Sequence, residues 1–130
     1  IQTETGNILY VEDNKMNQTV VKLLFKKNWD KANLTIANHG KEALEIMKEK
    51  KFDMILMDLQ MPEMDGYEAA TFIRNMEDTS KKDVPIIALT AAALSDVKEK
   101  VYSVGMNDFV TKPFNPVELR RKLSDIDKNK

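Results

Sequence analysis

The stretch FDMILMDLQMPEMDGYEAA, residues 52–70, joins a short apolar run to an aspartate, a turn and a segment of different spacing. The run over 52–57 lacks strict alternation of apolar and polar residues, which is typical of a strand buried on both faces of a parallel sheet. From residue 66 to residue 77 the apolar side chains recur at helical spacing. The stretch therefore predicts a buried strand, a turn and a helix in direct succession.

The same succession of a short apolar run and a longer amphipathic segment recurs along the chain. Ser95 and Asn115 are the expected N-caps of the last two helices, and Gly105 is the expected C-cap of the first of them. Pro116 takes the first position of the last helix, and the polar residues 77–83 form the one predicted long loop. The predicted strands span Asn7–Val11, 34–37, 52–57, 85–89 and Asp108–Thr111, and the predicted helices span 15–28, 41–50, 66–77, 95–104 and 116–126.

Five strand–helix repeats predict an α/β domain with a doubly wound, five-stranded parallel sheet, a (βα)5 arrangement. Right-handed crossovers place the helices on both faces of such a sheet, and ligands bind beyond the carboxyl ends of its strands. We expect a single domain over residues 1–130, with a core of about residues 6–126.

The composition narrows the classes of protein and of site. The 130 residues include 20 basic and 21 acidic side chains, so a net charge of −1 gives no electrostatic case for binding nucleic acid or a membrane. The absence of cysteine excludes disulfides and thiolate metal sites. No apolar run approaches the length of a membrane span, and no signal peptide is visible. Because the chain begins with Ile1, we expect it to be a piece excised from a longer protein.

Polar and charged side chains stand at the ends of four predicted strands. Glu12 and Asp13 follow the first strand, and Asp58 follows the third. Thr90 follows the fourth strand, and Lys112 follows the fifth. Three carboxylates on one rim repel one another unless a cation joins them or some are protonated. Mg²⁺ is the physiological cation that oxygen ligands of this kind hold. A carboxylate beside Mg²⁺ and a lysine is suited to act as a nucleophile toward a phosphoryl group.

Four motifs in this order resemble the receiver domain of two-component response regulators, over almost the whole chain. They are VEDN at 11–14, MDLQMPEMDG at 57–66, LTA at 89–91 and GMNDFVTKPF at 105–114. The resemblance implies the flavodoxin-like strand order 2-1-3-4-5. The motif VEDN, the pair Asn17-Gln18 and the triplet QMP at 60–62 are most like receivers attached to hybrid sensor histidine kinases.

The resemblance also implies a role for each acidic residue. Asp58 is the expected phosphoacceptor, and the domain is expected to catalyse its own phosphorylation and dephosphorylation. Asp13 is expected to bind Mg²⁺ directly, and Glu12 through a metal-bound water. Asp58 and the backbone carbonyl of Gln60 are the remaining metal ligands that the resemblance implies.

Three further residues receive roles from the same resemblance. Thr90 is expected to bind a phosphoryl oxygen and to move after phosphorylation. Lys112 is expected to pair with Asp58 and then with the phosphoryl group, and the family pattern implies a cis bond between Lys112 and Pro113. Phe109 takes the place of an aromatic switch residue, although many family members carry tyrosine there.

The implied partner is a phosphohistidine donor, either a histidine kinase or a histidine phosphotransfer domain. We expect this domain to contact neither nucleic acid nor a membrane, and to lie in the cytoplasm, with a membrane-anchored parent protein left open. A single-domain response regulator and the receiver of a regulator with an output domain remain alternatives to the hybrid kinase.

Two other classes of protein use related sites. An aspartyl-phosphate hydrolase of the haloacid dehalogenase type needs a second acid two residues after its nucleophile, and that position is Gln60. A flavodoxin-like cofactor binder needs a Ser-, Thr- or Gly-rich phosphate loop after the first strand. Here that loop reads EDNK at 12–15, whose acids repel a bare phosphate.

Overall fold

The computed structural model describes residues 6–61, 64–91, 94–112, 115 and 117–122. Its centre is a five-stranded parallel sheet with the order β2-β1-β3-β4-β5, which confirms the predicted doubly wound fold and strand order. The strands are β1 (Asn7–Val11), β2 (Asn33–Ala37), β3 (Met54–Asp58), β4 (Ile86–Thr90) and β5 (Asp108–Thr111).

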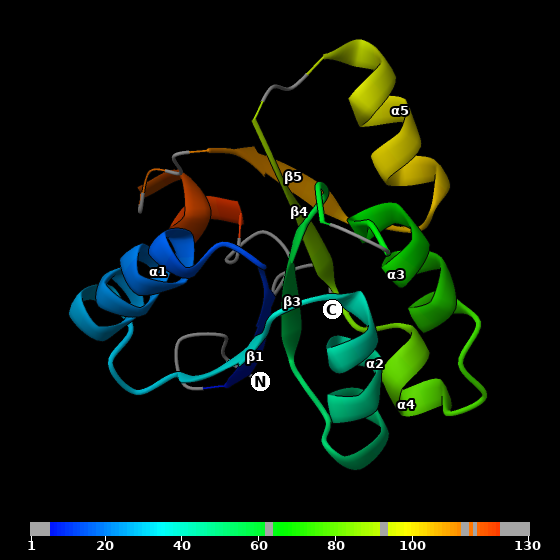
Figure 1. Ribbon diagram of the computed structural model, residues 1–130, viewed down its shortest axis with the longest axis horizontal. Coiled ribbons are helices and arrows are strands. Elements are labelled where there is room, and N and C mark those ends of the chain that lie inside the picture. Colours follow the sequence, from blue (N-terminus) through cyan, green and yellow to red (C-terminus); the bar gives the residue numbers. More distant parts are fainter. Residues whose placement is uncertain (1–5, 62–63, 92–93, 113–114, 116, 123–130) are drawn as a thin grey trace.

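Helices lie on both sides of this sheet. Figure 1 shows α1 with the last helical segment on one side, and α2, α3 and α4 on the other. No helix in the described part of the chain is long and apolar enough to cross a membrane. The helices are α1 (Lys15–Asn28), α2 (Gly40–Glu49), α3 (Gly66–Arg74), α4 (Thr79–Lys82) and α5 (Ser95–Ser103), and residues 117–122 are also helical.

The core consists of two apolar layers separated by the sheet. Successive side chains of a strand point to opposite faces. Leu9 and Val11 of β1 therefore pack in the layer under α2 and α3, whereas Ile8 and Tyr10 pack in the layer under α1. The central strands β1, β3 and β4 are buried on both faces, which explains why their sequences show no polar alternation.

The structure corrects the prediction of a loop over residues 77–83. The carbonyl of Asp78 accepts hydrogen bonds from the backbone N–H groups of Lys81 and Lys82, which closes the single turn of α4. A turn of four residues is too short to show an apolar period, so no periodic pattern predicts it. The preceding helix also ends earlier than predicted, at Arg74, with Asn75 as its C-cap.

The helix caps differ in part from the prediction. Ser95 is the first helical residue rather than the N-cap of α5, because Leu94 takes the cap position without a side-chain bond. Val104, not Gly105, is the C-cap of α5, and Gly105 follows it with a φ of 89°, the left-handed conformation that glycine adopts directly after a helix end. Asn115 accepts a hydrogen bond from the N–H of Val117 at 2.7 Å and so acts as the predicted N-cap. Pro116 and the segment 123–126 of the last predicted helix lie outside the described residues.

Candidate functional site

The residues predicted to form the site meet at the carboxyl ends of β1, β3, β4 and β5. Parallel register places the ends of neighbouring strands beside one another, for example Thr90 beside Thr111 and Asp58 beside Leu89. The N–H of Lys112 donates to the carbonyl of Thr90 at 2.8 Å, which fixes the start of the lysine side chain next to β4.

The Lys112 ammonium joins two carboxylates that lie 100 and 54 residues before it in the chain. Its Nζ atom lies 3.0 Å from Oε1 of Glu12 and 3.1 Å from Oδ1 of Asp58. Both carboxylates are buried, with exposed fractions of 1% for Glu12 and 4% for Asp58. The ammonium therefore offsets negative charge on two carboxylates that burial keeps from full hydration.

Side chains of β1 and α1 hold Glu12 in place. Tyr10 donates its hydroxyl to Oε1 of Glu12 at 3.1 Å, and Asn17 donates its side-chain amide to the same oxygen at 3.2 Å. Gln18 donates its side-chain amide to the backbone carbonyl of Glu12. The sequence assigned no site role to Tyr10. The pair Asn17-Gln18 enters the sequence analysis only through the family resemblance, because the sequence of a helix does not indicate which residues its side chains will contact in the folded protein.

The start of α1 follows directly from the local sequence. Asn14 caps the helix, and its side-chain oxygen accepts a hydrogen bond from the N–H of Asn17 at 3.0 Å. Asp13 therefore lies in the turn between β1 and the cap, where its side chain is exposed. This short turn keeps Asp13 at the same rim as Glu12.

Burial and neighbouring charge shift the pKa values at the site. Burial raises the pKa of Asp58 to about 7, with a further contribution from the adjacent Glu12, while Lys112 acts in the opposite direction. Burial also acts to raise the pKa of Glu12, but hydrogen bonds with Asp58, Lys112 and Tyr10 outweigh it and lower that pKa. Burial acts to lower the pKa of Lys112, and its bonds to Glu12 and Asp58 raise it overall.

The three carboxylates form an arrangement that can hold a metal ion. One oxygen each from Glu12, Asp13 and Asp58, here called the acidic cluster, lies within 4.8 Å of the other two. An all-oxygen set of this kind suits a hard cation such as Mg²⁺. Gln60 donates its N–H to Oδ1 of Asp58 at 3.2 Å, and its side chain is exposed beside the cluster.

Thr90 lies at the buried end of an adjoining hollow of about 490 Å³. Gly66 helps to shape this side of the site, because its N–H donates to the carbonyl of Leu59 at 3.1 Å and closes the turn after β3. A side chain at Gly66 would meet the backbone of Asp58. The hollow is lined by Leu59, Gln60, Met61, Asp65, Tyr67, Thr90 and Val97.

Phe109 does not join the acidic cluster. Its half-buried ring meets Tyr102 edge-on, with the two ring centroids 6.4 Å apart, and the Lys122 ammonium lies 4.5 Å from its centroid. Phe109 therefore connects β5 with α5 and the last helix. Pro113, for which a cis bond was expected, lies outside the described residues.

Comparison with known proteins agrees with this geometry. Residues 8–124 match the model of the response regulator receiver domain family. The chain is 41% identical to hybrid signal transduction histidine kinase I of Dictyostelium discoideum over 143 aligned residues, which cover 95% of this chain but 8% of that protein. The chain thus spans a small part of the hybrid kinases that it matches.

Two solved structures of receiver domains share the fold. A Pseudomonas aeruginosa sensor kinase receiver domain, with magnesium coordinated in its active-site cleft, is 40% identical, with a TM-score of 0.81 and coverage of 92% of this chain and 95% of that one. The Ssk1 receiver of Saccharomyces cerevisiae, crystallised with the histidine phosphotransfer protein Ypd1, is 38% identical, with a TM-score of 0.81 and coverage of 91% and 86%. This chain belongs to the response regulator receiver domain family.

Proposed function

We propose that this receiver domain accepts a phosphoryl group on Asp58 from a phosphohistidine donor. The observation that carries the proposal is the position of the Lys112 ammonium, which lies within 3.1 Å of Asp58 while Asp13 and Glu12 stand alongside. The ammonium offsets part of the negative charge around Asp58, which favours the approach of its carboxylate to a phosphoryl group.

The transfer uses one carboxylate oxygen of Asp58 as the nucleophile. A bond forms between this oxygen and phosphorus, and the bond between phosphorus and the donor imidazole breaks. The imidazole leaves with the electron pair and takes up a proton. Lys112 stabilises the negative charge on the transferred oxygens, and the Thr90 hydroxyl donates a hydrogen bond to one of them.

The acidic cluster fits the magnesium ion that this chemistry needs. Asp13 and Asp58 are direct ligands in this proposal, together with the backbone carbonyl of Gln60, and Glu12 acts through a bound water. The support is the mutual approach of the three carboxylate oxygens within 4.8 Å. When bound, Mg²⁺ supplies positive charge that screens Asp58 from its acidic neighbours and from the phosphoryl oxygens.

The relatives support a proposal for the phosphodonor and for the parent protein. We propose a histidine kinase or a histidine phosphotransfer domain as the donor, since a receiver that is 38% identical was crystallised with such a protein. We further propose that the parent protein is a hybrid histidine kinase, in which this domain works on the cytoplasmic side. The support is the identity with hybrid kinases of which this chain spans 8% and 6%.

Acetyl phosphate with Mg²⁺ tests the acceptor directly. We expect one phosphoryl group per chain, labile in acid and released by hydroxylamine, as an acyl phosphate must be. Asp58→Asn should abolish the labelling, whereas Asp30→Asn, at an exposed aspartate after α1, should leave it unchanged. Labelling that survives in Asp58→Asn, or that resists hydroxylamine, contradicts the proposal.

A further inference from the structure

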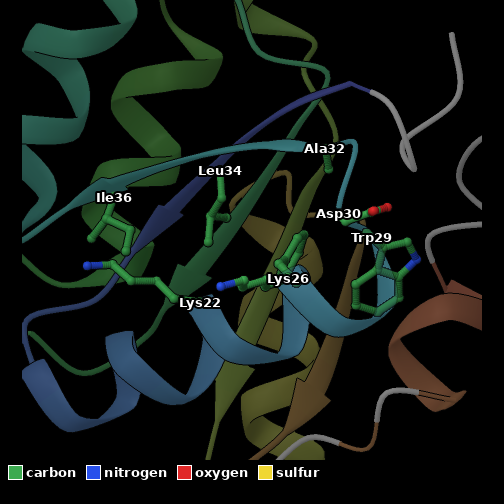
Figure 2. Close-up of a pocket in the computed structure, with 8 residues that line it drawn as sticks. Lys22, Lys26, Trp29, Asp30, Ala32, Leu34 and Ile36 are labelled. Atoms are coloured by element: carbon green, nitrogen blue, oxygen red, sulfur yellow. The ribbon is translucent and has the colours of Figure 1, made fainter.

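A second hollow, of about 500 Å³, lies between α1 and the strand β2, and none of the acidic cluster lines it. Figure 2 shows its apolar side, formed by Trp29, Ala32, Leu34 and Ile36, facing two lysines of α1, Lys22 and Lys26. We call this hollow the α1–β2 groove.

The groove runs along an open edge of the sheet. β2 is the first strand in the order and pairs with β1 alone. The N–H of Asn33 donates to Gly6, and the carbonyl of Ala37 accepts from Glu12. Because backbone groups alternate in direction along a strand, residues 33, 35 and 37 bond to β1. Leu34 and Ile36 therefore direct their N–H and C=O groups away from β1.

Leu34 and Ile36 thus contribute to the groove in two ways. Their side chains form part of its apolar lining, and their backbone groups face the side on which a further strand would lie. Both residues are half-buried. A binding partner in extended conformation can use both features at once, through backbone hydrogen bonds and through contacts of alternate side chains.

The positive charge beside the groove favours an acidic partner. α1 carries four lysines and no acidic residue, in a chain of net charge −1. Lys22 and Lys26 are exposed, and within the described part of the chain neither forms an ion pair. In Figure 2 their side chains extend along the groove below Ile36 and Leu34. Only Asp30 contributes an acidic side chain to the lining.

We propose that the α1–β2 groove binds an extended acidic peptide segment, which adds to β2 as a further strand. Its acidic side chains pair with Lys22 and Lys26, and its backbone bonds to Leu34 and Ile36. An anionic membrane surface would also attract the two lysines, but it cannot supply backbone groups to a strand edge. The open edge therefore favours a peptide.

Trp29 provides a direct measurement of binding. It is the only tryptophan in the chain, it lines the groove, and 3% of its surface is exposed. We expect a synthetic peptide of alternating valine and glutamate to change the Trp29 fluorescence saturably and to slow amide exchange at Leu34 and Ile36. Lys26→Glu should weaken binding about tenfold, because it replaces an attraction by a repulsion.

Lys27→Glu is the matched control. Lys27 is the next residue in the last turn of α1 and does not line the groove. Its substitution by glutamate makes the same change in charge as Lys26→Glu. Equal weakening by both variants would show diffuse electrostatic attraction and overturn the proposal. The proposal also fails if a peptide N-methylated at alternate bonds binds equally well, if anionic vesicles alone protect the two amides, or if the peptide causes no saturable change. Labelling of Asp58 by acetyl phosphate should be the same in both variants, so this test is independent of the proposed function.

Discussion

Asp58 lies where its negative charge lowers the stability of the folded protein. Its carboxylate is buried, with Glu12 close by, and Lys112 compensates only part of this charge. Its pKa of about 7 compares with an ordinary value of 3.8, so the folded protein binds the Asp58 proton more tightly than the unfolded chain does. The stability contribution of Asp58 should therefore fall as the pH rises from about 4 through 7.

Removal of this charge should stabilise the protein in the absence of Mg²⁺. We expect Asp58→Asn to raise the free energy of unfolding by about 2–4 kcal/mol at pH 8, and the gain should disappear near pH 4. Urea unfolding in EDTA at the two pH values measures the difference. Asp30→Asn, at an exposed position, is the control and should show no such gain. A destabilised Asp58→Asn protein at pH 8 would contradict this account of the site.

Among the helices and strands, Phe109 forms contacts that join β5 to α5 and to the last helix. Lys122 restrains it, because its ammonium donates to the backbone carbonyl of Phe109, binds Asp108 at 3.0 Å and lies over the Phe109 ring. Lys98 of α5 lies over the same ring, 5.4 Å from its centroid. A movement of Phe109 would therefore alter contacts with both α5 and the last helix.

Phosphorylation should shift α5 through Thr90 and Phe109. New phosphoryl oxygens offer the Thr90 hydroxyl a stronger acceptor, and its movement leaves space that Phe109 can fill. With a beryllofluoride mimic, we expect amide shifts at Phe109 and through residues 94–106. Thr90→Ala should remove these distant shifts while Asp58 still accepts the mimic.

Thr71→Ala is the control for this experiment, because Thr71 is an exposed threonine on α3. It should leave the pattern of amide shifts unchanged. If the shifts of the unsubstituted protein stay confined to residues 12–13, 58–66, 90 and 112, the domain is a rigid phosphoryl relay and no switch operates.

Arg74, at the end of α3, connects this helix with two other segments of the chain. Its guanidinium donates to the backbone carbonyls of Gly105 and Lys82 at 2.8 and 2.6 Å, and to the side-chain oxygen of Asn107 at 3.0 Å. The same oxygen of Asn107 accepts from the N–H of Ile86 at 2.8 Å. The end of α3 is thereby joined to α4 and to the segment that enters β5.

Loss of this guanidinium should loosen the entry into β4 and β5. We expect Arg74→Met to lower the free energy of unfolding by about 2–3 kcal/mol, since it leaves several acceptors without their donor. Amide exchange at Ile86 should become faster. Arg121→Met, at an exposed arginine, should change neither measurement. Unchanged exchange at Ile86 in Arg74→Met would rule out this connection.

At the scale of the whole molecule, magnesium should act as a stabilising ligand. A metal that binds only the folded acidic cluster raises the free energy of unfolding by about 1.4 kcal/mol at ten times its dissociation constant. We expect the urea midpoint to rise with Mg²⁺ concentration, and Asp13→Asn to weaken this response. Asp96→Asn, on α5, should keep it. A midpoint that does not respond to Mg²⁺ would contradict the metal assignment.

Sequence patterns were enough to predict the α/β class and the bounds of β1 and β5, and they placed the bounds of the other three strands to within two residues. The apolar runs are local signals, because a strand buried on both faces needs apolar residues at every position. The end of each run also located Glu12, Asp13, Asp58, Thr90 and Lys112 at one rim, since parallel strands bring their carboxyl ends together. The order of the strands came from family resemblance, and the structure confirmed it.

The packing of the folded chain sets which side chains complete the site and its surroundings. Asn17 of α1 reaches Glu12 at the end of β1, and Lys122 of the last helix reaches Phe109 of β5, through contacts between separate elements that periodicity does not connect. The single turn of α4 and the absence of a Ser95 cap depend on backbone bonds that the packed chain selects. Local patterns fix the elements because they reflect burial along one segment, whereas the partners of a side chain depend on how distant segments pack together.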